Sequence, residues 1–267
     1  MEVAATQRRA EDHLKSLTKV VRILECFSRV ERTLSLGDLC RRTDIPKSTA
    51  HRIVSSLREA GFLEQARGGD HYRLGLKLFE LGNIALANME LHREARPIVG
   101  ALSRVSGEIV HLAVFDGAQA VVIHRSDPAP AGVGPLTFLE AAPLHCTGVG
   151  KAILAFQPEE AIERLIGFGL QRYTEATIVD GAKLRAELAQ VRERGFSVDR
   201  AEHEPGVHCI GAPIHDAGGR VFASISVSGP ARRMSEAEGV PQIVIHHAET
   251  ISAALGFRRP SPADSSG

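Results

Sequence analysis

Between residues 16 and 60, apolar side chains recur every three or four positions, which is the period of an α-helix. A first helix is predicted from Leu17 to Phe27. A second is predicted from Leu36 to Arg42, because Ser35 and Asp38 have the spacing of a capping box. After a tight turn, a third helix is predicted to begin at Pro46, whose fixed φ suits a first helical position, and to run to about Ala60.

The third predicted helix has one apolar face and one polar, cationic face, which carries Lys47, Ser48, His51, Arg52 and Ser55. A short helix, a tight turn and a helix of this kind form a helix-turn-helix, whose second helix enters the major groove of DNA. His51 and Arg52 are the candidates for base contacts. Lys47, Ser48 and Thr49 are candidates for phosphate contacts, because free amides and the helix dipole attract anions at a helix N-terminus. The alternative is a three-helix interaction domain with a solvated polar face.

Residues 62–74 alternate between apolar and polar side chains on both sides of a Gly-Gly pair, which predicts a β-hairpin wing. Arg67, His71 and Arg73 would then reach toward phosphates. Residues 14–77 contain 13 Lys and Arg against 7 Asp and Glu, whereas residues 78–267 contain 17 against 22. The wing and this basic excess favour a polyanion, DNA, as the partner of the first module.

Residues 76–89 predict a helix that is apolar around more of its circumference than one packing face requires. A second helix of the same kind would cover it, and the small residues Gly82, Ala85 and Ala87 would allow close approach. This segment is therefore the first candidate for a contact between two copies of the chain.

The rest of the chain alternates between strand and helix patterns. Antiparallel pairs are predicted for 109–115 with 119–125 and for 209–215 with 221–228, because each pair flanks a turn that contains Asp and Gly. Helices are predicted at about 91–105, 148–156, 158–168, 180–194 and 235–256. Strand pairs separated by helices indicate an α+β domain built on an antiparallel sheet.

The composition, 43% hydrophobic and 24% charged, is that of a globular protein. No apolar run approaches the roughly 18 residues of a membrane span, and the N-terminus lacks the apolar core of a signal peptide. We therefore expect a cytoplasmic protein. The four cysteines form no Cys-x-x-Cys pair, so they are expected to be reduced thiols.

Three stretches offer polar groups suited to a ligand pocket. The segment 148–150, Gly-Val-Gly, opens a predicted helix, so its free amides could hold a carboxylate. Ser226 and Ser228 lie two apart on a predicted strand and face the same side. Asp199 ends one short strand-like segment and Cys209 begins another. Each has a plainer explanation, because such Ser pairs often bond to the neighbouring backbone and a lone buried Cys is usually a small hydrophobe.

Four motifs in this order resemble the IclR family of bacterial transcriptional regulators: residues 17–27, 45–57, 144–154 (LHCTGVGKAIL) and 226–230 (SVSGP). The resemblance runs from about Leu17 to Phe257. It implies a GAF-like effector domain, homodimers that often pair into tetramers, and pseudo-palindromic operators near catabolic genes. We accordingly divide the chain into a winged helix-turn-helix (14–75), a linker and dimerisation helix (76–90), a GAF-like effector-binding domain (91–258) and a disordered tail (259–267).

The family's effector-contacting positions carry over to seven residues of this sequence: Ala142, Gly148, Val149, Asp199, Cys209, Ser226 and Ser228. The sequence departs from the small-acid sensors of the family at Val149, where a smaller residue is common, and at Ala142, where a larger one occurs. The set offers amide and hydroxyl donors for a carboxylate and contains no arginine. The expected effector is a small organic or aromatic acid.

Other functions are less well supported by the residues. A hydrolase using Cys209 or Ser226 would need an activated nucleophile, and no Gly-x-Ser-x-Gly motif is present. A dimer that binds DNA without an effector is a third alternative. The sequence around Lys151 lacks the first Gly and the final Ser or Thr of a phosphate-binding loop. The set His203, His208, Cys209 and His215 matches no standard zinc spacing. We therefore expect no catalytic site, no metal and no cofactor.

Overall fold

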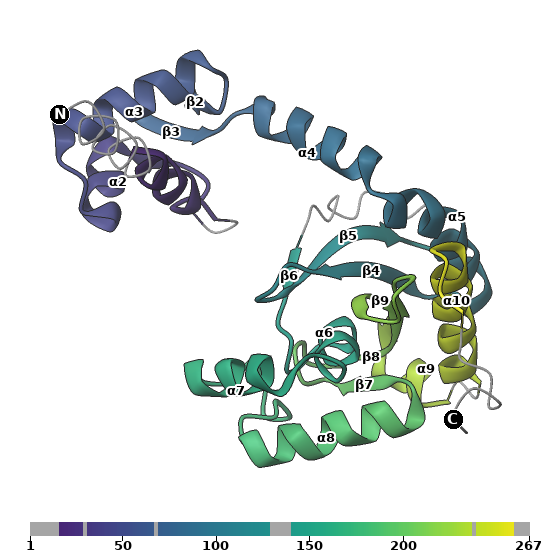
Figure 1. Ribbon diagram of the computed structural model, residues 1–267. Helices are drawn as coiled ribbons and strands as arrows, with labels where there is room; N and C mark the ends of the chain where they lie inside the picture. Colours follow the sequence, from purple (N-terminus) through teal and green to yellow (C-terminus); the bar gives the residue numbers. More distant parts are fainter. Residues whose placement is uncertain (1–15, 29–30, 67–68, 129–139, 237–238, 259–267) are drawn as a thin grey trace, which may run out of the picture. The chain divides into compact units, whose positions relative to one another are not determined.

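The computed structural model describes residues 16–28, 31–66, 69–128, 140–236 and 239–258. The chain divides into two compact units, Met1–Leu86 and Ala87–Gly267, and Figure 1 shows the elements of each. In the described part of the chain, no helix is both long and apolar enough to cross a membrane. The tail predicted at 259–267 lies outside the described residues.

The N-terminal unit is a winged helix-turn-helix, as the sequence predicts. Its described part contains a helix over residues 16–25, then α2 (Leu36–Thr43) and α3 (Lys47–Glu59). Its sheet has the strand order β1-β3-β2, with β1 (Leu34–Ser35), β2 (Leu63–Gln65) and β3 (His71–Leu74). Buried side chains from all of the helices meet the sheet in one core: Ile23, Leu34, Leu39, Ile45, Ala50, Val54, Leu57 and Leu63.

The turn between α2 and α3 follows from local hydrogen bonding. Ser35 and Asp38 form the expected capping box at the start of α2, with the Asp38 amide donating to Ser35 Oγ at 3.2 Å. Asp44 ends α2 in the left-handed conformation (φ 52°), which turns the chain into α3. Pro46 precedes α3 as its N-cap, with ψ 139°, so the helix begins one residue later than predicted.

The linker helix α4 (Leu76–Asn88) has no buried residue. Four of its large apolar side chains are exposed: Leu76, Phe79, Leu81 and Ile84.

The C-terminal unit is built on a six-stranded antiparallel sheet with the order β6-β5-β4-β9-β8-β7. Its strands are β4 (Ile109–Phe115), β5 (Ala120–Ser126), β6 (Glu140–Ala142), β7 (Ser197–Arg200), β8 (Val207–His215) and β9 (Val221–Pro230). The two predicted hairpins, β4–β5 and β8–β9, pair side by side at the centre of the sheet through β4 and β9.

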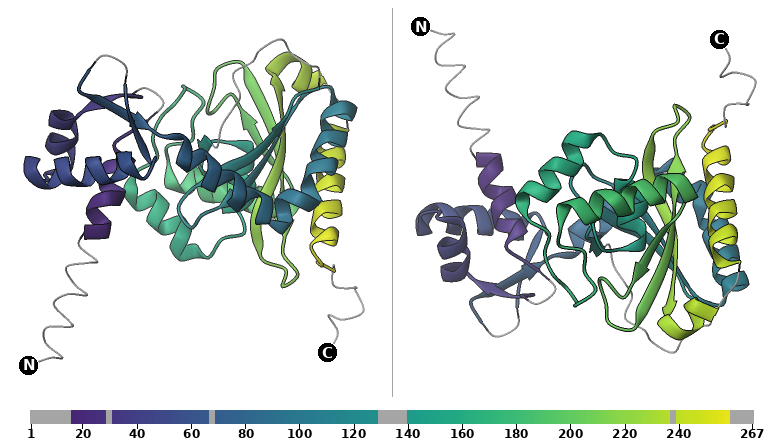
Figure 2. Two further views of the ribbon diagram at one scale, coloured as in Figure 1. Left: turned by 90° about the horizontal axis from the view of Figure 1, so that it is seen from above. Right: turned by 90° about the horizontal axis from the view of Figure 1, so that it is seen from below.

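Helices cover both faces of this sheet (Figure 2). One face is covered by α5 (Glu90–Ser106) and α10 (Val240–Ala254), which contact each other and the central strands. The other carries α6 (Gly148–Leu154), α7 (Glu159–Phe168) and α8 (Gly181–Arg194), whose apolar side chains join the sheet in a second core. This arrangement confirms the α+β class.

Two elements of the C-terminal unit differ from the sequence expectation. The short edge strand β6 has no counterpart among the predicted strands. The helix predicted over 235–256 is wrong at its start, because α9 (Ala231–Glu236) is separate and α10 begins after Gly239, whose φ of 84° breaks the helix.

Candidate functional site

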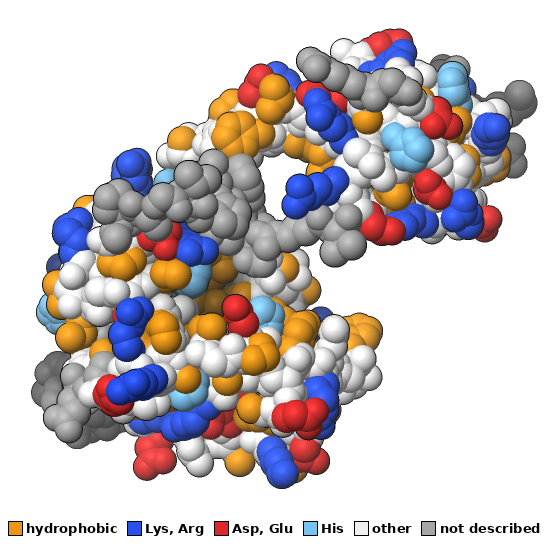
Figure 3. Space-filling view, turned by 180° about the vertical axis from the view of Figure 1, so that it is seen from behind, with side chains coloured by type: hydrophobic (Ala, Val, Ile, Leu, Met, Phe, Trp, Pro, Cys, Tyr) orange, Lys and Arg blue, Asp and Glu red, His pale blue; other side chains and the backbone are white. Residues whose placement is uncertain are grey.

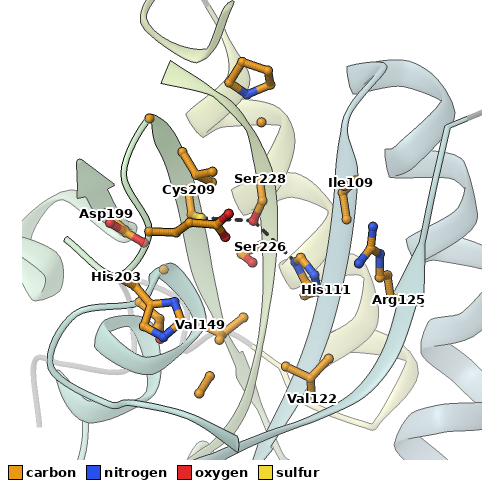
Figure 4. Close-up of a pocket in the computed structure, with 18 of the residues that line it drawn as sticks. Ile109, His111, Val122, Arg125, Val149, Asp199, His203, Cys209, Ser226 and Ser228 are labelled. Atoms are coloured by element: carbon orange, nitrogen blue, oxygen red, sulfur yellow. Dashed lines mark hydrogen bonds between the residues drawn. The ribbon is translucent and has the colours of Figure 1, made fainter. Parts of the chain in front are cut away.

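A cavity of about 500 Å³ lies in the C-terminal unit between the sheet and α6. Its described lining comes from α6, from all six strands of the sheet and from the segment that joins β7 to β8. Figure 4 shows the labelled side chains around it. A cavity of this size suits a small organic molecule, since ligand pockets typically span ~300–1,000 Å³.

Two rows of paired residues cross the floor of the cavity. In the first row, Arg125 pairs with His111, which pairs with Ser226. In the second row, Ile109 pairs with Ser228, Ser228 with Cys209, and Cys209 with Asp199. Directly opposed side chains on one face of a sheet lie ~5 Å apart, so each row is a continuous line of neighbouring side chains, of which only Ile109 is apolar.

The other wall is the start of α6, which approaches the sheet very closely. A Cβ atom at Gly211 would lie 2.4 Å from the carbonyl oxygen of Gly148, so glycine at position 211 is required for this approach. Ser197 Oγ donates to the same carbonyl at 2.6 Å. These contacts fix Gly148 and Val149 at the edge of the cavity.

The structure brings all seven of the effector residues expected from the sequence to this one cavity. They are Ala142 on β6, Gly148 and Val149 on α6, Asp199 on β7, Cys209 on β8, and Ser226 and Ser228 on β9. Ser226 and Ser228 face the same side of their strand, as predicted, and both are buried.

Sequence reasoning did not assign several polar residues of the lining to the ligand pocket: His111, Arg125 and Glu204 were not singled out, and His203 was weighed only as a zinc ligand. The expected set contained no arginine, whereas Arg125 lies in the cavity wall and donates from Nη2 to Asp127 Oδ1 at 2.9 Å. Val122 and Arg125 both line the cavity although they are three residues apart, because a β-bulge interrupts the β4–β5 pairing, so simple alternation along β5 does not identify Arg125.

Burial changes the charge state of the cavity groups. It raises the pKa of the Asp199 carboxyl to about 6, although the Glu202 amide donates to its Oδ1 at 2.7 Å. Burial raises the pKa of the Cys209 thiol to about 12 and lowers the pKa of His111 to about 4. Ser228 Oγ donates to Cys209 Sγ at 3.0 Å. At neutral pH, Cys209 is therefore a thiol and His111 an uncharged imidazole.

These states do not suit covalent catalysis, because the thiolate is the nucleophilic form of cysteine. The neighbouring hydroxyl of Ser228 is 3.3 Å from His111 Nδ1, and that imidazole gains a proton only under acidic conditions. The pair is better suited to hydrogen bonding with a ligand than to proton transfer.

Lys151 of α6 is fully buried. Its Nζ donates to the Val198 carbonyl and to Glu202 Oε1, each at 2.6 Å, and lies 3.4 Å from Glu187 Oε1. This ammonium group joins α6 to β7 and α8. It is not part of a phosphate-binding loop.

The histidines considered as zinc ligands lie apart. His203 lines the cavity, whereas His215 stacks on Phe257 with ring centroids 4.7 Å apart. Among the residues that the structure describes, no three His, Cys, Asp or Glu side chains form a group that could hold a metal ion.

In the N-terminal unit, α3 presents the predicted polar residues on its outer side. Lys47, Ser48, His51 and Arg52 are exposed, and Thr49 and Ser55 are half-buried. In the wing, Arg73 is exposed and donates from Nη2 to Glu64 Oε2 at 2.8 Å. Arg67 lies outside the described residues.

Comparison with models of known protein families identifies the family of this chain. The model of the IclR helix-turn-helix domain matches residues 16–67, and that of the bacterial transcriptional regulator IclR C-terminal domain matches residues 83–253, more than half of the chain. The chain belongs to the IclR family. It is a DNA-binding transcriptional regulator and not an enzyme, so the hydrolase alternative is not supported.

Individual IclR-family relatives agree. The transcriptional repressor AllR of Salmonella paratyphi A is 34% identical over 261 residues, covering 94% of this chain and 93% of the relative. The transcriptional repressor IclR of Escherichia coli is 34% identical over 263 residues, with 94% and 93% covered. The crystal structure of an IclR homologue from Microbacterium hydrocarbonoxydans, complexed with 4-hydroxybenzoate, is 28% identical, with a TM-score of 0.75 over 90% of this chain and 98% of that one.

Proposed function

We propose that this IclR-family regulator controls a catabolic operon from the cytoplasm by binding a pseudo-palindromic operator and sensing a small organic or aromatic acid. The observation that carries the proposal is the convergence of the seven residues Ala142, Gly148, Val149, Asp199, Cys209, Ser226 and Ser228 on one cavity of about 500 Å³. The relative from Microbacterium hydrocarbonoxydans, whose structure contains an aromatic acid, supports the same class of ligand.

For DNA, we propose that Arg52 and His51 contact bases. Lys47, Ser48, Thr49 and Ser55, with Arg67 and Arg73 of the wing, contact the backbone. The exposed side of α3 supports this assignment. Arg73 must exchange or share its ion pair with Glu64 to reach a phosphate.

We propose that the operator is bound by a homodimer in which α4 contacts its copy. Hydrophobic side chains gather over α4 in Figure 3, and its exposed Leu76, Phe79, Leu81 and Ile84 support an interface. Two recognition helices related by two-fold symmetry bind half-sites one or more helical turns apart. A pairing of two such dimers gives the tetramer.

The proposal is tested by selecting binding sites from a random duplex pool and measuring affinity for the winning site. The expected result is a pseudo-palindrome whose affinity falls steeply between about 50 and 200 mM salt, as counterions are released. A thermal-shift screen of organic and aromatic acids then identifies the effector class. An effector should change operator affinity by a coupling of about 1–3 kcal/mol.

The DNA-binding part and the effector-binding part of the proposal can fail independently. A flat salt dependence would contradict the assignment of α3 and the wing to DNA. Specific DNA binding without a thermal response to any acid would leave a purely architectural dimer.

A further inference from the structure

The loop that joins β7 to β8, residues 201–206 (the β7–β8 loop), lies at the edge of the cavity. His203 of this loop lines the cavity, and Figure 4 shows it on the same side as Asp199. Of the described residues that line the cavity, four are exposed to solvent: Ala141, Glu204, Gly206 and Pro230. Two of these four belong to the β7–β8 loop, which therefore lies where the cavity meets solvent.

A second loop packs against the first. It joins α7 to α8 over residues 169–180 (the α7–α8 loop) and carries Tyr173, whose ring lies against the imidazole of His203 with centroids 4.9 Å apart. Tyr173 is 40% exposed and does not line the cavity. The His203 side chain therefore has the cavity on one side and the partly exposed ring of Tyr173 on another.

Threonine hydroxyls connect the two loops. Thr177 Oγ1 donates to the Glu202 carbonyl at 2.6 Å and accepts from the Tyr173 amide at 3.0 Å. Thr174 Oγ1 donates to the Ala201 carbonyl at 2.7 Å. Thr177 is buried, so water competes little for its bonds. One buried hydroxyl therefore links the backbone of Tyr173 directly to the β7–β8 loop.

The two ends of the β7–β8 loop are fixed within the C-terminal unit. At the first end, Lys151 Nζ donates to Glu202 Oε1 at 2.6 Å. At the second end, the Ala231 amide donates to the Gly206 carbonyl at 2.8 Å. Residues 203–205 lie between these two anchors. The ring contact with Tyr173 therefore acts on the part of the loop that its anchors do not hold directly.

We propose that Tyr173 is a positioning residue, which holds His203 at the mouth of the cavity and so limits the size of the molecules that can enter. Thr177 fixes the backbone of Tyr173 and thereby stabilises the closed mouth. When Tyr173 moves away, His203 can swing outward and the mouth widens. This inference rests on the proposed function only in taking the cavity as the effector site, and its test requires no effector.

The thiol of Cys209 reports on access, because Cys209 lines the cavity. Its alkylation rate in the full-length protein is measured by peptide mass spectrometry with N-methylmaleimide and N-phenylmaleimide, which share a reacting group and differ in size. Tyr173→Ala should accelerate the reaction with the phenyl reagent at least about five-fold, and that with the methyl reagent less, because a local opening favours the larger molecule more. Thr177→Val should act in the same direction. A change in the reactivity of the thiol itself would accelerate both reagents equally.

Three further variants separate positioning from a general loss of structure. Tyr173→Phe keeps the ring against His203 and should react as the original protein does. Phe168→Ala is the matched control, because this aromatic residue ends α7 beside the same loop and is 90% exposed, and it should also leave both rates unchanged. In a His203→Ala background, Tyr173→Ala should add no further acceleration, because Tyr173 acts through His203.

Equal Cys209 rates in the original protein, Tyr173→Ala and Thr177→Val would overturn the inference, as would equal acceleration of both reagents. It is also overturned if the buried Cys146 is accelerated as much as Cys209, since the whole unit has then loosened. If Tyr173→Ala does not fold, Thr177→Val decides alone, because valine keeps the shape of threonine and removes only the hydroxyl. Unchanged labelling leaves the effector function standing, whereas an acid screen without a ligand removes that function and leaves the labelling result.

Discussion

The ammonium group of Lys151 is a buried charge that holds three elements together. Its side chain is fully inaccessible, and it bonds Glu202 and the Val198 carbonyl while approaching Glu187. Removing one partner of such a group leaves the opposite charge buried without compensation, which is usually more costly than replacing the whole group.

We therefore expect Lys151→Met to lower the free energy of unfolding by about 3–5 kcal/mol. Adding Glu202→Gln should recover part of this loss, because it removes the carboxylate left in the interior. Urea unfolding followed by circular dichroism measures both. The control Lys183→Met, at an exposed position of α8, should change stability by less than about 0.5 kcal/mol. No recovery in the double variant would contradict the ion-pair explanation.

Asp199 gives a pH-dependent contribution to stability. Burial raises its folded-state pKa to about 6, above the ordinary value of 3.8, so the folded protein holds this proton more tightly than the unfolded chain. The stabilisation from this proton is complete below about pH 4. It is lost as the pH rises through 6, where the ionised carboxylate becomes a cost.

Asp199→Asn should therefore raise the free energy of unfolding above pH 6 by up to about 3 kcal/mol, and the melting temperature with it. The gain should shrink toward pH 4, where both side chains are uncharged. An asparagine oxygen can still accept the hydrogen bond from the Glu202 amide. Thermal unfolding between pH 4 and 8 measures this, with Asp70→Asn as an exposed control. A gain that is the same at every pH would show that the carboxylate charge is not the cause.

At the scale of elements, α3 is proposed to make two kinds of DNA contact along its length. Lys47 is at the helix start, where amides and side chains position the protein on phosphates. His51 and Arg52 are one turn further along and exposed. Side chains at such positions of a recognition helix reach base edges in the major groove.

Arg52→Ala and His51→Ala should each reduce the preference for the selected operator over random duplex DNA, at a cost of about 1–3 kcal/mol on the specific site. Lys47→Ala should weaken both DNAs to a similar extent and reduce the salt dependence. Fluorescence anisotropy with both duplexes measures this. If all three variants lose the same affinity on both DNAs, the division into base and phosphate contacts is wrong.

The elements that the sequence predicted well are those with local signals. The capping box of Ser35 and Asp38 located α2, and the turn at Asp116 and Gly117 located the β4–β5 hairpin. The edge strand β6 is only three residues long and is defined by pairing with β5, so the local pattern contained too little to predict it.

The candidate site likewise contains residues that the sequence identifies and residues that it does not. The seven residues carried over from the family motifs gather at the cavity, whereas Arg125 depends on the register of a hairpin. A β-bulge between Leu112 and Ala113 shifts this register, so that His111 pairs with Arg125 and not with the residue that counting from the turn would give. Such a bulge has no sequence signal in a single chain.

At the scale of the whole molecule, regulation requires that the effector distinguish two conformations of the proposed dimer, because a ligand with equal affinity for both does not change their populations. The linker helix α4 spans the boundary between the two compact units, which makes it the candidate carrier of the change. The ligand contacts and the DNA contacts are then separable by mutation, since they belong to different units.

The double variant Ser226→Ala with Ser228→Ala tests this separation. Both hydroxyls are buried and line the cavity, and replacing them removes two donors without adding bulk. Operator affinity without effector should be unchanged, and the effect of the acid on that affinity should be lost. Ser252→Ala, which removes a buried hydroxyl on α10 outside the cavity lining, is the control and should respond as the original protein does. Anisotropy titrations of operator with and without the acid give the result. A double variant that still responds normally would mean that these serines serve only the fold and that the effector binds elsewhere.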